Sequence, residues 1–190
     1  MSFSSENLRR CGSALALGMN TTVKGKDLTK EAPRSPRVRI GGYAILARTY
    51  DKCCALLGGD IGDYHFDCPL DNMLFGFKGV TGDDFKAEVE KGATDEQMAN
   101  WLDNHGSPKT PEEVEAWSDA IEATNPYNNP EKREWFEEQV KPYDLDPAKT
   151  TLFDWLEVDD KASYQKAAYP RHVAQASCLW GRQASCLTRE

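Results

Sequence analysis

The sequence has no long hydrophobic run, and this absence excludes several protein classes. No stretch approaches the roughly 18 apolar residues that a membrane-spanning helix needs. Near the start, the longest apolar stretch is Ala14 to Leu17, shorter than the core of about 7 to 15 apolar residues in a secretory signal. We therefore expect a soluble cytoplasmic protein with no membrane association.

The sequence also lacks the motifs that define common catalytic and metal sites. It contains only three histidines, no CxxC or HExxH spacing and no nucleophile elbow. The glycines between Gly58 and Gly62 lack the lysine and the spacing of a phosphate-binding loop. The cysteines of the central region, Cys53, Cys54 and Cys68, are odd in number and include an adjacent pair, so we expect reduced thiols rather than a disulfide framework.

The net charge of −8 is distributed unevenly along the chain. Residues 26–160 contain 15 basic and 29 acidic residues, a net charge of −14, whereas residues 1–25 and 161–190 have net charges of +2 and +4. The central region is itself polarised, with +4 on residues 26–59 and −18 on residues 60–160. A body this acidic repels phosphate backbones, so we do not expect nucleic acid as a partner.

These contrasts predict one domain at residues 26–160, flanked by two extensions. The C-terminal extension, residues 161–190, contains Gln-Ala-Ser-Cys-Leu at 175–179 and again at 183–187. Two such units are too few and too short for a solenoid, whose repeats span about 20 to 50 residues. We expect this tail and the N-terminal extension, residues 1–25, to be disordered, and Met19 offers a second start close to the domain.

The periodicity of the central region predicts a mostly α fold, a single small domain of about five to six helices. Ser35 followed by Pro36 is typical of a helix N-terminus, so we expect a first helix from there to about Leu57, ended by Gly58 and Gly59. Apolar residues at helical spacing and two capping-box patterns predict the later helices, at residues 83–91, 95–104, 111–123, 130–140 and about 150–158.

Residues 62–78 follow a different pattern. Tyr64 and Phe66 alternate with polar residues, and Phe75 and Phe77 alternate in the same way. Period two is typical of strands, so we expect a short β-hairpin near 62–78, joined through residues 68–71.

Four short segments carry a family resemblance. They are Asp27-Leu28-Thr29-Lys30, Pro33-Arg34-Ser35-Pro36, Leu46-Ala47-Arg48-Thr49 with Asp51-Lys52, and Tyr64-His65 with Cys68-Pro69-Leu70-Asp71. In order and spacing they resemble a bacterial family of uncharacterised proteins, the domain-of-unknown-function family 5069. The resemblance covers about residues 26–160 and leaves both ends outside. It implies a small bacterial domain and no particular activity.

The first candidate site is a histidine among carboxylates. On an extended segment Asp63, His65 and Asp67 share one face, where they could bind a divalent metal or orient His65 as a general base. Cys68 and Asp71 lie close by in sequence, and Cys53 or Cys54 could add sulfur for zinc. The alternative is a histidine paired with a neighbouring carboxylate in a surface loop.

The second candidate site is basic. Arg34, Arg37, Arg39, Arg48 and Lys52 lie at the start and middle of the predicted first helix, and arginines beside a helix N-terminus favour an anion such as phosphate or carboxylate. The alternative is that these side chains form salt bridges to the acidic later helices.

The missing motifs favour a non-catalytic small domain that binds a protein partner or a small ligand. Two alternatives stay open: a metal-dependent enzyme using His65 with Asp63 and Asp67, and an anion or phosphate binder using the basic first helix. The sequence assigns no cofactor and no oligomeric state.

Overall fold

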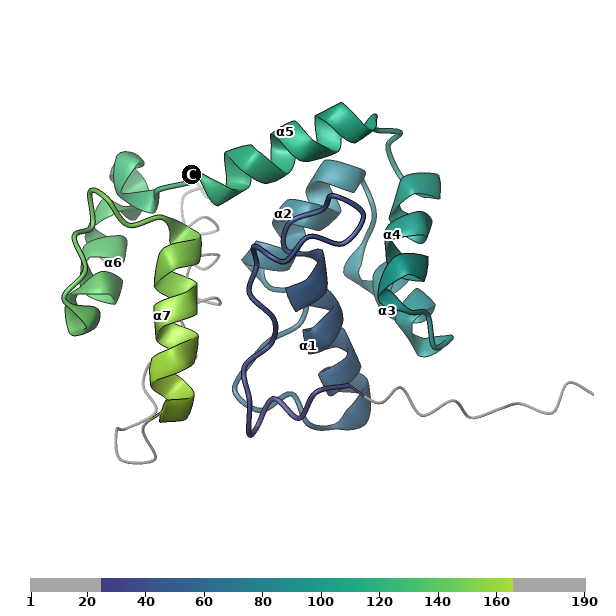
Figure 1. Ribbon diagram of the computed structural model, residues 1–190, viewed down its shortest axis with the longest axis horizontal. Coiled ribbons are helices and arrows are strands. Elements are labelled where there is room, and N and C mark those ends of the chain that lie inside the picture. The colour runs from purple at the N-terminus through teal and green to yellow at the C-terminus, as the bar shows by residue number, and fades with distance from the viewer. Residues whose placement is uncertain (1–24, 166–190) are drawn as a thin grey trace, which may run out of the picture.

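The computed structural model describes residues 25–165, and within them the chain forms helices joined by loops (Figure 1). The prediction of a mostly α domain is confirmed, with slightly more helices than the five to six expected, and the described residues contain no strand. The seven α-helices are α1 (Leu46–Gly58), α2 (Pro69–Lys78), α3 (Gly82–Glu90), α4 (Asp95–Asn104), α5 (Pro111–Glu122), α6 (Pro130–Val140) and α7 (Leu152–Gln165). Two short 3₁₀ helices, η1 (Pro126–Asn128) and η2 (Lys141–Tyr143), flank α6. The extensions predicted at the two ends lie almost entirely outside the described residues.

The helices from α3 to α6 lie within one residue of the predicted bounds, because their first turns contain strong capping signals. The backbone N–H of Thr94 donates to Oε1 of Gln97 over 2.8 Å, and the backbone N–H of Gln97 donates back to Oγ1 of Thr94 over 3.3 Å. Thr110 and Glu113 form the same reciprocal pair at the start of α5. The last helix, α7, begins close to the prediction but continues to Gln165, well beyond residue 158.

The predicted start of the first helix was wrong, because α1 begins at Leu46 and not after Pro36. Gly41, Gly42 and Ile45 have φ angles of 58°, 87° and 70°, which no right-handed helix accommodates. A Cβ atom on Gly41 would lie 2.6 Å from the Cβ of Ala99, so the glycine also allows α4 to approach. Residues 36–45 therefore form a loop that lies against the helices and is not itself helical.

The predicted hairpin near 62–78 was also wrong. Cys68 is the N-cap of α2, Pro69 is its first residue, and the carboxylate of Asp71 accepts a hydrogen bond from the backbone N–H of Cys68. These positions match a helix start, with proline at the first position and an acidic residue in the first turn. The alternation of Phe75 and Phe77 does not reflect a strand, because the buried residues of α2 follow helical spacing, with Leu74, Phe75 and Lys78 on the inner face.

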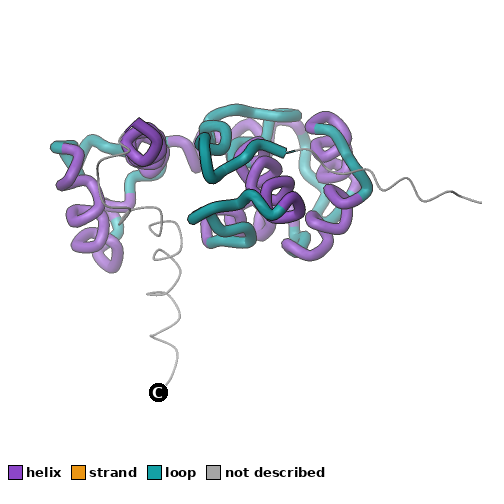
Figure 2. The backbone as a smooth tube through the Cα atoms, turned by 90° about the horizontal axis from the view of Figure 1, so that it is seen from below, coloured by secondary structure: helices purple, strands orange, loops and turns teal. Residues whose placement is uncertain are grey.

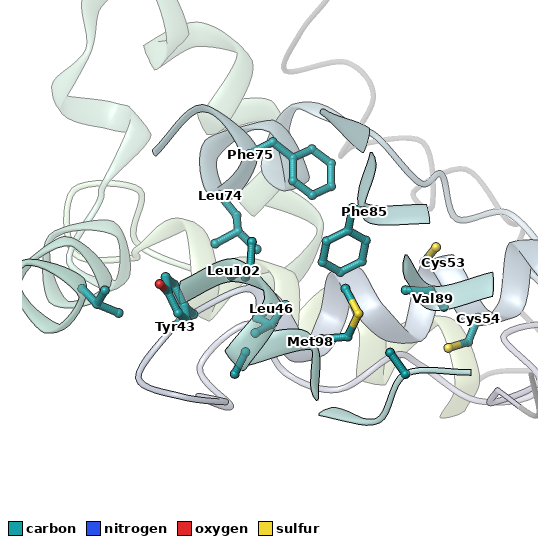
Figure 3. Close-up of a cluster of buried hydrophobic side chains, with 13 residues drawn as sticks. Tyr43, Leu46, Cys53, Cys54, Leu74, Phe75, Phe85, Val89, Met98 and Leu102 are labelled. Atoms are coloured by element: carbon teal, nitrogen blue, oxygen red, sulfur yellow. The ribbon is translucent and has the colours of Figure 1, made fainter. Parts of the chain in front are cut away.

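The larger hydrophobic core lies among α1 to α4 with Val114 of α5 (Figure 3). At its centre the rings of Phe75 and Phe85 are 5.4 Å apart between centroids, and Phe85 also meets Trp101 edge to face. Aromatic contacts of this kind add about 0.5 to 1.5 kcal/mol to the free energy of burial. This core fixes the orientation of α1, the helix that carries Arg48 and Lys52.

A second core joins α6 and α7 and also includes Ala44 and Ile45 before α1 and Leu70 of α2. Helices α6 and α7 lie at the end of the molecule opposite α3 and α4 (Figure 2). Trp135 and Phe136 of α6 contact Trp155 of α7, with the two indole rings nearly perpendicular and 5.6 Å apart. Figure 1 shows α5 running along one side of the molecule between the two ends. Ionic side chains connect α7 to α1 and its preceding loop, and these contacts form the site described below.

Candidate functional site

Arg48 of α1 is buried and pairs with Asp160 of α7. Its guanidinium donates to both oxygens of that carboxylate, over 2.6 Å from Nη1 and 3.0 Å from Nη2. The hydroxyl of Tyr64 donates to the same carboxylate over 2.9 Å, and the guanidinium carbon lies 5.5 Å from the centre of the Tyr64 ring. Arg48 is only 2% exposed, so this bidentate pair is shielded from water.

Lys52, one helical turn further along α1, pairs with Asp71 of α2. Its Nζ lies 2.8 Å from a carboxylate oxygen of Asp71, 3.1 Å from the carbonyl oxygen of His65 and 3.2 Å from Sγ of Cys68. The hydroxyl of Thr49 donates to the other oxygen of Asp71 over 2.8 Å. Burial by itself lowers the pKa of Lys52, but the charge of Asp71 outweighs it, and the net result is a raised pKa that keeps the ammonium charged.

Arg34 and Arg37 extend the network from the loop before α1. Arg34 donates to Asp51 of α1, over 2.8 Å from Nη2 to Oδ1, and to Asp95 at the start of α4. Arg37 contacts carboxylates from two other helices, which are Glu122 of α5 and Asp154 and Glu157 of α7. Through Arg34 and Arg37, the loop is therefore connected by charged groups to α4, α5 and α7.

The structure brings together five of the residues predicted from sequence, which are Arg34, Arg48, Lys52, Cys68 and Asp71, with Arg37 at the edge of the same network. The carboxylates that complete it were not predicted as site residues. Asp51, Asp95 and Asp160 face arginines up to 112 residues away. The basic segment was expected either to bind an anion or to form salt bridges to the acidic later helices. The observed contacts are salt bridges of the second kind.

Asp63, His65 and Asp67 do not come together in this way. All three side chains are exposed in the loop before α2, and the loss of the predicted hairpin removes their common face. The carboxylate of Asp67 accepts from Nδ2 of Asn72, while His65 contributes only its backbone carbonyl to Lys52. Over residues 25–165, no group of three or more histidine, cysteine and acidic side chains is arranged to hold a metal ion.

The thiols of the region are free and buried. Cys53 and Cys54 lie in the larger core, and burial raises the pKa of both thiols, that of Cys54 to about 11. A thiol that stays protonated near neutral pH is a poor zinc ligand, because the metal binds the thiolate.

Asp159 lies beside Asp160 on α7 and is also buried. Its carboxylate accepts a hydrogen bond of 2.6 Å from the hydroxyl of Tyr143, in η2. Burial raises the pKa of Asp159 to about 6, and the nearby charge of Asp160 acts in the same direction, while the bond from Tyr143 opposes them. Near neutral pH the fold therefore holds the ionised carboxylate of Asp159 in a buried position next to a second negative charge, which is unfavourable.

We expect Asp159→Asn to stabilise the protein at pH 7. Because the pKa of this group is raised on folding, the stability that it contributes is present at low pH and is lost as the pH rises through about 6. Asparagine keeps an acceptor for Tyr143 without the charge, so the free energy of unfolding at pH 7 should rise by about 1 to 3 kcal/mol. Urea unfolding from pH 4 to 8 measures this gain. A variant whose advantage is as large at pH 4 as at pH 7 contradicts the assignment.

No helix among residues 25–165 has the length and apolar character needed to cross a membrane. The fold and the site thus define a small helical domain held together by buried ion pairs. Residues 30–162 match the model of a family described as Domain of unknown function (DUF5069), and the chain belongs to this family. A comparison with curated proteins gave no match.

Proposed function

We propose that this domain is a non-catalytic binding module whose partner is a protein with a basic surface. The observation that carries the proposal is the use of charge within the fold. Five basic residues before position 60 are all paired with carboxylates of the domain itself, and these are Arg34, Arg37, Arg39, Arg48 and Lys52. Apart from the buried Asp159, the remaining acidic residues of the described chain are exposed or partly exposed. There they create a negative potential that steers a cationic partner into contact.

Helix α6 is the part of this acidic surface that we propose for contact. Glu134, Glu137 and Glu138 are exposed, and none of them forms an ion pair within residues 25–165. The opposite side of α6 is anchored by Trp135 and Phe136, which pack on α7. The three carboxylates are therefore held on a rigid helix instead of a mobile loop, and this favours a defined contact.

The two alternatives find less support. A metal-dependent enzyme using His65 would need Asp63 and Asp67 to turn toward it from separate positions in an exposed loop. An anion binder using Arg37 and Arg48 would need its ligand to displace carboxylates that already occupy both guanidinium groups. We also propose a cytoplasmic setting in a bacterium, which the family resemblance and the buried free thiols support.

The proposal is tested with the full chain and a fluorescent peptide rich in lysine and arginine, using fluorescence anisotropy. The variant Glu134→Gln/Glu137→Gln/Glu138→Gln removes the charge of α6 without shortening its side chains. With about 0.5 kcal/mol for each exposed charge contact, we expect the Kd to increase about tenfold. Added salt should weaken binding of the peptide to the unaltered protein, and it should reduce the difference in Kd between that protein and the triple variant.

The matched control is Asp60→Asn/Asp63→Asn/Asp83→Asn. It changes the net charge by the same amount at exposed positions outside α6. This control should keep most of the affinity. Equal weakening by both triple variants would mean that only the overall charge acts, which removes the role proposed for α6, and failure of the unaltered protein to bind the cationic peptide removes the proposed function.

A further inference from the structure

Lys78, the last residue of α2, is buried in an unusual way. Its side chain is 0% exposed, yet its Nζ has only one hydrogen-bond partner, the carbonyl oxygen of Ser107 at 2.9 Å. No carboxylate within residues 25–165 forms an ion pair with it. Arg48 and Lys52 are equally buried, but each faces a carboxylate.

An ammonium group taken out of water without a counter-charge is unfavourable, so such a group tends to lose its proton. Burial lowers the pKa of Lys78, the positive charge of Lys109 lowers it further, and Asp103 of α4 acts in the opposite direction. A lysine whose pKa is lowered has more of its neutral, nucleophilic amine at a given pH than an ordinary lysine.

A single turn of chain separates this amine from solvent. Residues 103–108 are all exposed, and the backbone N–H of Ser107 donates to the carbonyl oxygen of Lys78. Gly106 has a φ of 70°, and a Cβ atom there would lie 2.0 Å from the same carbonyl oxygen, so the turn rests directly on the end of α2. Nζ of Lys78 is thus held by a carbonyl oxygen that belongs to an exposed turn.

Lys109, at the end of this turn, supplies a second cation. Its Nζ lies 5.0 Å from the centre of the ring of Phe77, the residue that precedes Lys78 on α2. The charge of Lys109 acts on the amine of Lys78, and a buried amine within reach of a second cation suits a carbonyl compound that also carries a negative charge. The neutral amine attacks the carbonyl carbon, and the cation pairs with the charged group.

We propose that Lys78 is a reactive amine that forms an imine with a small carbonyl compound bearing a carboxylate, and that Lys109 binds the carboxylate. The lone pair of Nζ adds to the carbonyl carbon to give a carbinolamine. That intermediate loses its hydroxyl group and the remaining amine hydrogen as one water molecule, which leaves a carbon–nitrogen double bond. The step needs no oxidant or reductant, and water reverses it.

The test uses the full chain with glyoxylate as the probe and cyanoborohydride to trap the imine, followed by peptide mass mapping. The reference is Lys141, an exposed lysine with no ion pair among the described residues. We expect labelling of Lys78 to persist at lower pH than labelling of Lys141, because more of its amine is neutral there. Lys78→Arg should abolish the adduct at this position. If arginine prevents folding, the pH comparison in the unaltered protein decides alone.

Replacing the second cation separates a binding site from simple chemical reactivity. Lys109→Met should slow labelling of Lys78 by glyoxylate about fivefold more than labelling by the uncharged acetaldehyde. Loss of the Lys109 charge raises the pKa of Lys78 and slows both reactions, whereas glyoxylate alone also loses an ion pair. Lys86→Met on α3 is the matched control and should change neither rate. The proposal is overturned if Lys78 stays unlabelled in the folded protein at a pH at which Lys141 reacts, or if Lys109→Met slows both aldehydes equally.

Discussion

Replacing Asp71 by asparagine should lower the free energy of unfolding by about 3 to 5 kcal/mol, because it leaves the charge of Lys52 buried without a partner. The two side chains are in contact at 2.8 Å, and both are almost completely shielded from water. Asparagine has nearly the same size and can still accept from the hydroxyl of Thr49, so the predicted loss reflects charge and not a cavity. Urea unfolding at pH 7 measures it.

The double variant Lys52→Met/Asp71→Asn distinguishes this explanation from general disruption. Methionine fills much of the volume of the lysine stem without its charge, so the double variant should recover at least half of the stability lost in Asp71→Asn. A double variant that is less stable than either single variant would show that the pair acts through packing, and would contradict the electrostatic account.

The helices that sequence patterns predicted well are those whose first turns contain their own signals. Thr94 with Gln97, and Thr110 with Glu113, are local capping pairs, and the helices begin where these pairs require. The first helix was misjudged because the conformation of Ile45 depends on tertiary contacts. Its N–H donates to the carbonyl of Pro36 and its side chain is buried in the second core. Propensity along the chain cannot reveal such contacts.

The error at residues 62–78 has a different origin. Cys68, Pro69 and Asp71 together form a helix start, but cysteine is an uncommon N-cap and the pattern was interpreted as a connection between strands. The alternation of Phe75 with Phe77 then supported the wrong period. The segment has only ten residues, so its short alternation fits both a strand and a helix. The cap at Cys68 is what distinguishes the two.

The charged residues of the site were predicted more successfully than their roles. Arg48, Lys52 and Asp71 were all selected from the sequence, and they lie in one buried network. Their use as internal ion pairs followed from the polarity of charge, with basic residues before position 60 and acidic residues after it. The identity of each partner could not be predicted in this way, because Arg48 and Asp160 are 112 residues apart in the chain and meet only once α7 has packed.

This network also gives Arg48 a particular role in holding α7. The helix packs on α6 through aromatic rings, and Arg37 pairs with its Asp154 and Glu157. The buried ion pair between Arg48 and Asp160 joins it to α1. Asp160 follows Asp159 in the chain, so two carboxylates lie together at a buried position, and the positive charge of Arg48 acts on both. Loss of that charge affects both carboxylates at once.

Arg48→Met should therefore destabilise the protein by about 3 to 5 kcal/mol at pH 7, as expected when one partner of a buried ion pair is removed. Arg48→Lys should recover only part of this loss, because an ammonium cannot donate to both carboxylate oxygens in the geometry that the guanidinium adopts. The loss from Arg48→Met should shrink at low pH, where protonation of Asp159 removes one of the two negative charges.

Arg39 provides the matched control for this variant. It pairs with Asp119 and Glu122 of α5, but Arg39 is 29% exposed and Asp119 is 65% exposed. Ion pairs of this kind contribute about 0 to 1 kcal/mol, so Arg39→Met should lie within that range in the same urea experiment. Similar losses in Arg39→Met and Arg48→Met would mean that the burial of an ion pair does not determine its contribution, and would contradict the role assigned to Arg48.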